Sequence, residues 1–218
     1  MGTRRHHGKT TGPGGPVTAT AGARRILGID PGSVRTGYGV IELDGTATRH
    51  VTSGVIPAGS GPFAERLHTI FAALERIIAD YAPGESAIEE VFVNRNVQSA
   101  LKLGQARGAA MCACAGAGLA VHEYTPRAVK QALVGRGGAE KDQVGYMVRA
   151  ILALDSAPAE DAADALAVAL AHTQHDRLGS RIAAQTGGTG AKQGTPVSAG
   201  AASASGPRAS TRIRRRPA

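Results

Sequence analysis

Both ends of this 218-residue chain lack acidic side chains. All 17 aspartates and glutamates lie within residues 26–176, whereas 13 of the 25 lysines and arginines lie outside that range. The end segments are rich in small and polar residues and lack periodic apolar ones, so burial does not offset the entropy cost of ordering them. We therefore predict a disordered basic tail over residues 1–24, one domain over 25–176, and a second disordered basic tail over 177–218.

The chain also lacks long apolar runs and has little cysteine. No stretch is long enough to span a bilayer, and the N-terminal segment has no apolar region of the kind found in signal peptides. Cys112 and Cys114 lie in one expected helix and point in different directions, which argues against a mutual disulfide. These absences favour a protein of the reducing cytoplasm with no membrane partner.

The net charge of +8 comes from the two tails, because residues 26–176 alone carry a net charge of −5. Within that segment, residues 95–149 hold eight basic side chains and three acidic ones, and the remainder is strongly acidic. An acidic cluster beside a basic stretch suits an enzyme that binds cations and grips a polyanion.

The hydrophobic pattern predicts an α/β domain with a mixed five-stranded sheet and helices on both faces. Short apolar or alternating segments indicate strands, and apolar residues at helical spacing indicate helices. The expected strands are 25–30, 36–43, 48–56, 87–93 and 119–124. The expected helices are 62–81, 97–118, 126–134, 141–154 and 158–172.

Several acidic residues interrupt these apolar elements. Asp30 ends one strand, and Glu89 and Glu90 lie inside another, where an ionised carboxylate is costly unless it is paired or bound to a metal. Asp161 and Asp164 are three residues apart and share one face of the last helix. Oxygen ligands without a set of Cys or His partners point to Mg²⁺ or Mn²⁺.

Some of these acids also have simpler explanations. Asp30 suits the start of the turn that follows it, and Asp161 suits the first turn of a helix. Strand alternation puts Glu89 and Glu90 on opposite faces without deciding which of them faces the site. The coincidence of four such acids nevertheless favours a shared metal site.

Motifs spread over about residues 25–175 resemble those of the RuvC family of Holliday-junction resolvases. The long central motif is the most specific of them, whereas the opening Asp-Pro-Gly alone would be weak. The motifs are Ile26–Ser33 (ILGIDPGS), Thr36–Ile41 (TGYGVI), Ala87–Phe92 (AIEEVF), Ser99–Gly108 (SALKLGQARG), Val129–Gln131 (VKQ), Ala139–Lys141 (AEK) and Asp161–Ala167 (DAADALA).

The resemblance implies an RNase H-like fold and an endonuclease that resolves four-way DNA junctions in recombination and repair. It assigns the catalytic, metal-binding positions to Asp30, Glu89, Asp161 and Asp164 and leaves Glu90 out. Some family members carry His at the position of Asp161. The implied cofactor is Mg²⁺, two ions per site and about 3.5–4 Å apart, with Mn²⁺ as a substitute.

The same resemblance implies a homodimer and a branch-migration motor of the RuvA and RuvB type as partners. Gly104 and Gly108, four apart in the helix expected over 97–118, suit a dimer interface, although packing on the protein's own sheet explains them equally well. The expected DNA-binding residues are Phe92, Arg95, Lys130 and Lys141, with either lysine able to stabilise charge on the reacting phosphate.

Three other functions fit part of the pattern. Actin-like ATPases and sugar kinases also open with an Asp-x-Gly-Ser turn, but they need two such domains, and about 150 residues supply one. A junction-binding scaffold without catalysis would not need four acids. An RNase H-like nuclease acting on RNA is disfavoured by the motif over Ala100–Gly108.

Overall fold

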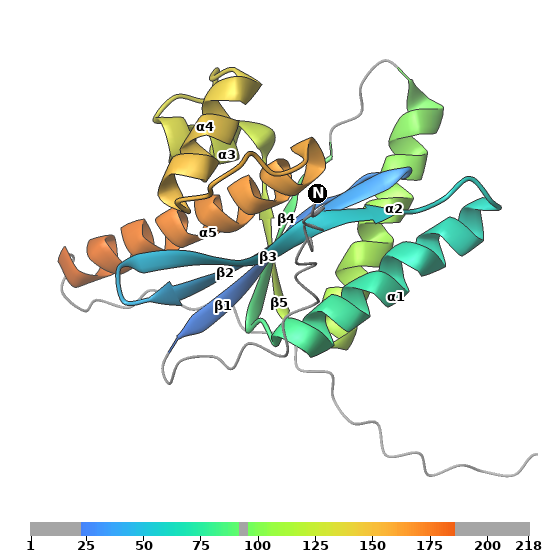
Figure 1. Ribbon diagram of the computed structural model, residues 1–218, viewed down its shortest axis with the longest axis horizontal. Coiled ribbons are helices and arrows are strands. Elements are labelled where there is room, and N and C mark those ends of the chain that lie inside the picture. The colour runs from blue at the N-terminus through green and yellow to red at the C-terminus, as the bar shows by residue number, and fades with distance from the viewer. Residues whose placement is uncertain (1–22, 92–95, 186–218) are drawn as a thin grey trace, which may run out of the picture.

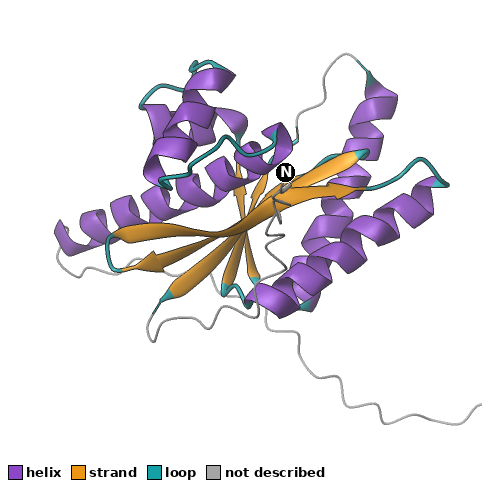
Figure 2. Cartoon of the chain, viewed as in Figure 1, coloured by secondary structure: helices purple, strands orange, loops and turns teal. Residues whose placement is uncertain are grey.

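The computed structural model describes residues 23–91 and 96–185, with side chains as far as Gly179. A twisted five-stranded sheet lies between two layers of helices (Figures 1 and 2). The strands are β1 (Arg24–Asp30), β2 (Arg35–Asp44), β3 (Ala47–Pro57), β4 (Glu85–Glu89) and β5 (Ala120–Tyr124). The predicted mixed sheet with helices on both faces is confirmed.

Each face of the sheet has its own apolar core. On one face, α1 (Phe63–Tyr81) and α2 (Val97–Gly116) cover side chains such as Leu27 and Ile29 of β1. The helices on the other face cover Ile26 of β1. They are α3 (Pro126–Val134), α4 (Lys141–Ile151) and α5 (Glu160–Gln185).

The strand order β3-β2-β1-β4-β5 combines an antiparallel half with a parallel half. β1, β2 and β3 form an antiparallel meander, whereas β1, β4 and β5 run parallel to one another. Parallel neighbours end at the same edge of a sheet, so the last residues of β1 and β4 lie side by side. Ile29 is in register with Ile88, and the residue after each is an acid.

Helix α5 approaches β1 and β2 at positions that have no side chain. A Cβ atom added at Gly28 would lie 2.1 Å from the carbonyl oxygen of Ala165, and one at Gly37 would lie 1.9 Å from that of Asp161. At Gly39 a Cβ atom would lie 2.6 Å from an α5 side chain. Glycine is therefore required on this face for α5 to pack as closely as it does.

Helix α5 ends later than the sequence pattern predicts, since the expected helix stopped at residue 172. The structure continues α5 to Gln185, so residues 177–185 are helical and the predicted boundary after 176 is wrong. The polar segment beyond Thr173 carries no apolar stripe, but it contains no proline and continues a helix that is already anchored. At the other end Arg24, assigned to the N-terminal tail, begins β1.

β4 is shorter than predicted and ends at Glu89. Of the residues expected to extend it, Phe92 and Val93 lie outside the described part of the chain. Cys112 is exposed and Cys114 is buried, and both are free, as expected. Among the described residues, no helix is both long enough and apolar enough to cross a membrane.

Candidate active site

Two of the four predicted acids stand at adjacent strand ends. Asp30 is the last residue of β1 and Glu89 is the last residue of β4, one step beyond the paired Ile29 and Ile88. Both isoleucines belong to the core on the α1 and α2 side, so by alternation the two acids face α5. Glu90 then faces the other side, which agrees with its exclusion from the predicted site.

The other two acids come from the beginning of α5. Asp161 lies in its first turn, where the helix crosses β2 at Gly37, and Asp164 lies one turn further along on the same face. The first turn of a helix carries a partial positive charge that favours carboxylates. The structure thus brings all four predicted acids to one place, from two strands and one helix.

Burial and mutual repulsion make this a strained group of charges. Burial, together with the carboxylates of Glu89, Asp164 and Asp161, raises the pKa of Asp30 from 3.8 to about 7. Burial and Asp164 likewise raise the pKa of Glu89 from 4.5 to about 7, although Lys141 and Lys130 partly oppose this. The four acids contain no positive charge among themselves, and bound cations would neutralise the repulsion between their carboxylates.

Lysine and arginine side chains supply part of that charge. The Lys141 ammonium lies 2.7 Å from Asp164 Oδ2 and 2.6 Å from Glu160 Oε1. Burial alone would lower the pKa of Lys141, but its hydrogen bonds to these two carboxylates raise it well above the usual range. Arg35 Nε lies 2.7 Å from Asp161 Oδ2. Lys141 and Arg35 therefore contact the two α5 acids.

A hollow of about 190 Å³ opens beside the acids. Glu89 and Asp164 line it together with Lys130 of α3 and Lys141 of α4, and its remaining walls are largely apolar. Both predicted DNA-binding lysines therefore border the same hollow as two of the acids. The other two predicted DNA-binding residues, Phe92 and Arg95, lie outside the described residues.

Three residues of this region were missed by the sequence analysis. Arg35 and Glu160 enter through their ion pairs, and Arg107 of α2 donates from Nε to the carbonyl oxygen of Glu89 at 3.1 Å. Arg107 thus fixes the end of β4 from the opposite face of the sheet. Arg107 belongs to the motif Ser99–Gly108, but only its contact between α2 and β4 shows that it holds the end of the strand that carries Glu89.

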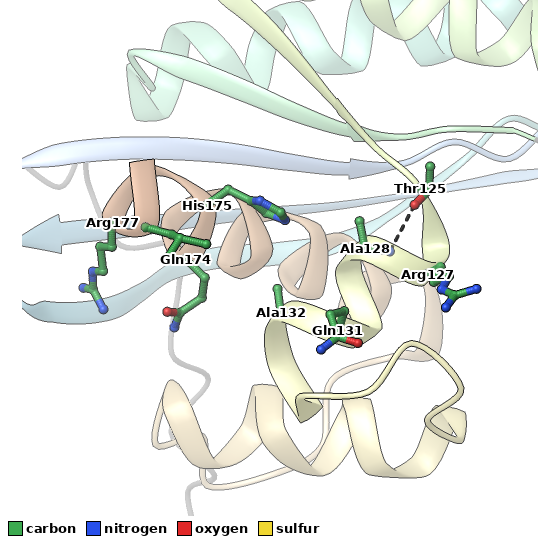
Figure 3. Close-up of a pocket in the computed structure, with 9 residues that line it drawn as sticks. Thr125, Arg127, Ala128, Gln131, Ala132, Gln174, His175 and Arg177 are labelled. Carbon is green, nitrogen blue, oxygen red and sulfur yellow. Dashed lines mark hydrogen bonds between the residues drawn. The ribbon is translucent and has the colours of Figure 1, made fainter. Parts of the chain in front are cut away.

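A larger hollow, of about 750 Å³, lies between α3 and the later part of α5 (Figure 3). Gln131 of α3 and Gln174, His175 and Arg177 of α5 are among its lining residues. None of the four predicted acids borders it. Size alone therefore selects the wrong hollow, and the carboxylates mark the candidate active site.

Four carboxylates with only oxygen donors fit divalent cations such as Mg²⁺, which prefer such ligands. The sheet order is that of the RNase H-like fold, and acids gathered at the ends of its central strands suit a metal-dependent nuclease. The family model described as crossover junction endodeoxyribonuclease RuvC matches residues 26–172. The chain belongs to the RuvC family.

Individual relatives agree with this assignment. RuvC of Alkalilimnicola ehrlichii is 58% identical over 158 residues, which are 72% of this chain and 96% of the relative. RuvC of Halorhodospira halophila is 58% identical over 165 residues, 75% of this chain and 97% of the relative. Family membership confirms the predicted enzyme class, a nuclease, and removes the actin-like and non-catalytic alternatives.

Solved structures give the same result. Thermus thermophilus RuvC in complex with a Holliday junction substrate superposes with a TM-score of 0.68 at 39% identity, covering 72% of this chain and 97% of that one. The yeast mitochondrial Holliday junction resolvase Ydc2 has a TM-score of 0.55 at 11% identity, over 75% of this chain and 86% of its own. At that identity Ydc2 supports the fold alone.

Proposed function

We propose that this protein binds four-way DNA junctions and hydrolyses one phosphodiester in each of two symmetry-related strands, in recombination and repair. The observation that carries the proposal is the convergence of Asp30, Glu89, Asp161 and Asp164 at one edge of the sheet. The likeness to Thermus thermophilus RuvC, described in complex with a Holliday junction substrate, supports this choice of DNA. RuvC of Alkalilimnicola ehrlichii and RuvC of Halorhodospira halophila are bacterial proteins, so the proposed location is the cytoplasm, where the bacterial chromosome lies.

In this proposal the four acids hold two Mg²⁺ ions, for which Mn²⁺ substitutes. Such a pair, when bound, activates a water on one side of the scissile phosphate and stabilises the leaving oxygen on the other. The raised pKa of Asp30 and that of Glu89, both about 7, support cation binding, because bound cations would offset both the burial and the carboxylate repulsion that raise these values.

The basic residues around the hollow position the DNA backbone. Lys141 and Lys130 border it with Glu89 and Asp164, where an ammonium group can neutralise charge that develops on the reacting phosphate. Lys141 also forms an ion pair with Asp164, with Nζ 2.7 Å from Oδ2. Phe92 and Arg95 follow β4 in the sequence, so we propose that they contact DNA next to the cut.

The proposed homodimer uses the outer face of α2. The inner face packs on the protein's own sheet through Ala106 and Ala110, which are fully buried. Gly104 and Gly108 do not take part in this packing, since a Cβ atom at either would meet nothing within 4 Å, and Leu101 on the same outer face is 58% exposed. A two-fold symmetric junction needs two cuts, and an isologous dimer presents two sites about the same axis.

A Gly108→Leu variant tests this interface. We expect it to shift the protein towards monomer in sedimentation and to replace paired cuts by single nicks. Gly116→Leu, near the end of the same helix and also in open space, is the matched control. The dimer would be excluded if the unmodified core, residues 23–185, sedimented as a monomer at micromolar concentration and still made paired cuts.

We further propose that a branch-migration motor of the RuvA and RuvB type is a partner of this protein.

We also propose that residues 1–22 and 186–218 act as basic tails around one nuclease domain. The two segments carry 9 of the 25 basic residues and no acid. Deleting both should retain selective junction cutting and reduce the salt dependence of DNA affinity, because fewer phosphates are neutralised. Loss of junction selectivity would show that the tails have a structural role.

One assay tests the central proposal. A synthetic four-way junction, a linear duplex of the same sequence and an RNA–DNA hybrid are each incubated with the protein, with and without Mg²⁺. We expect paired cuts in the junction only, and only with the metal. Preferred cutting of the hybrid would instead indicate a nuclease of the same fold that acts on RNA.

A further inference from the structure

A second group of metal-ligating side chains lies beneath α5, the helix that carries Asp161 and Asp164, but away from the four acids. It combines Glu85, the first residue of β4, with His122 of β5 and His172 of α5. One ligand atom from each lies within 4.8 Å of the other two. His172 is fully buried, whereas His122 is 41% exposed, so the group is open to solvent on one side.

The distances suit a single small ion. Glu85 Oε2 lies 2.8 Å from His172 Nε2 and 3.7 Å from His122 Nε2. Tetrahedral Zn²⁺, with bonds of about 2.0–2.2 Å to nitrogen and oxygen, sets its ligand atoms roughly 3.3–3.6 Å apart. Small side-chain rotations are therefore enough to reach ligand geometry. Asp176 Oδ2 lies 3.7 Å from His172 Nε2 and pairs with Arg24, so it would serve as a fourth ligand by moving from Arg24 to the ion.

The surrounding hydrogen bonds suit a metal-bound state as well. The Tyr124 hydroxyl lies 2.7 Å from His172 Nδ1 and can either donate to it or accept from it. A metal-bound histidine donates its other ring N–H to a neighbouring acceptor, and the Tyr124 hydroxyl can accept from Nδ1 when Nε2 binds the ion. Arg24 pairs with Glu85 Oε1 at 3.0 Å, which leaves Oε2 for the ion.

We propose that Glu85, His122 and His172, with Asp176, bind one Zn²⁺ ion at a site separate from the nuclease centre. Two imidazoles beside a carboxylate select such a metal, whereas the all-carboxylate group favours Mg²⁺. Glu85 and Glu89 share one strand face four residues apart, which separates the two sites by roughly 13 Å. The ion would tie α5 to β4 and β5 at the end of the sheet opposite the acids.

The alternative is that these side chains form a hydrogen-bonded network in which Arg24 supplies the only positive charge. Zn²⁺ binding to full-length protein is measured in millimolar Mg²⁺, which competes with Zn²⁺ for the carboxylates proposed to hold Mg²⁺, and the His122→Ala variant then shows which site holds the Zn²⁺. Competition with a chromogenic zinc chelator gives the stoichiometry and affinity. Heating the same samples shows whether the ion stabilises the fold.

We expect one Zn²⁺ per chain and a melting temperature raised by roughly 5–10 °C at a hundredfold excess over the dissociation constant. His122→Ala should weaken binding at least tenfold, and Asp176→Asn should weaken it less. His68→Ala, which removes an exposed histidine of α1, should bind as the parent does. Ring resonances of His122 and His172 should shift with Zn²⁺ in NMR spectra, and those of His68 should not.

Equal Zn²⁺ affinity in the parent and in His122→Ala would overturn the proposal, as would no binding in the presence of Mg²⁺. The ring resonances decide the matter even if His122→Ala folds poorly, because they are recorded on the parent. Nuclease activity in Mg²⁺ is measured on the same variants, so that the Zn²⁺ site and junction cleavage are tested separately. The proposed site is independent of the junction cleavage proposed above, so failure of one leaves the other standing.

Discussion

The two ends of the interface between α5 and the sheet hold opposite electrostatic arrangements. At one end, buried carboxylates repel one another, and the pKa of Asp30 and that of Glu89 rise to about 7. At the other end, Glu85 accepts from His172 at 2.8 Å and pairs with Arg24 at 3.0 Å, so its charge is balanced within the chain. The same helix and the same strand build both ends.

This difference suggests that the carboxylates at one end of α5 act in catalysis, whereas the network of Glu85, His172 and Arg24 at the other end stabilises the fold. A group of like charges lowers stability and is kept where it does a task, whereas a balanced network holds elements together. Changes at the carboxylate end should therefore alter activity far more than stability. Changes at the histidine end should alter stability far more than activity.

The largest expected effect is on cleavage. The rate of junction cutting should fall by more than about a hundredfold in each of Asp30→Asn, Glu89→Gln and Asp164→Asn. The loss should exceed the roughly 10–100-fold typical of mutating a residue that only hydrogen-bonds to a metal ligand. Junction binding, measured by gel shift in Ca²⁺, should remain, because phosphate contacts come from basic residues. Asp161→Asn should have a milder effect, since the family resemblance implies that His is accepted at this position in some members.

Glu90→Gln is the matched control for Glu89→Gln. It changes the neighbouring acid in the same way but on the opposite face of the sheet, and it should cut at the parental rate. If Glu90→Gln lost activity and Glu89→Gln did not, the assignment of faces in β4 would be wrong.

The next effect is on stability at the histidine end. His172→Leu leaves the Tyr124 hydroxyl and the Glu85 carboxylate without their buried partner, so the free energy of unfolding in EDTA should fall by about 2 kcal/mol. Cleavage in Mg²⁺ well below the melting temperature should stay within about twofold of the parent. A loss of cleavage as deep as in Asp30→Asn would show that the two ends are not separable.

The smallest effect is a pH dependence. The folded pKa of Asp30, about 7, exceeds its ordinary value of 3.8, so folding favours the protonated form. Stability of the metal-free protein should therefore fall as pH rises between these values. At pH 8 in EDTA, Asp30→Asn should be more stable than the parent by about 1 kcal/mol, and the gain should shrink towards pH 5. Urea unfolding with parallel pH profiles for both proteins would contradict this.

The carboxylate end could be predicted because its signals are local. An acid that ends an apolar strand and a pair of acids three apart on a helix are visible in the sequence, and the choice of Glu89 over Glu90 came from the family resemblance. The structure supplies the physical reason, which is the parallel register of Ile29 with Ile88.

The histidine end could not be predicted in this way. Glu85, His122 and His172 are widely separated in the chain, and they meet only because β5 pairs with β4 and α5 crosses both. The ion pair of Arg35 with Asp161 was missed for the same reason, since it depends on where α5 crosses β2. The length of α5 was underestimated because its last turns bury little.

The glycines beneath α5 affect how mutations in this protein should be interpreted. Gly28 and Gly37 carry no chemistry, yet a methyl group at either would meet the backbone of the helix that bears Asp161 and Asp164. In a saturation scan for recombination defects, these positions should therefore group with the acids, and no conservative replacement should rescue them. A search for essential residues by charge alone would pass over them, although they set the distance across which the acids act.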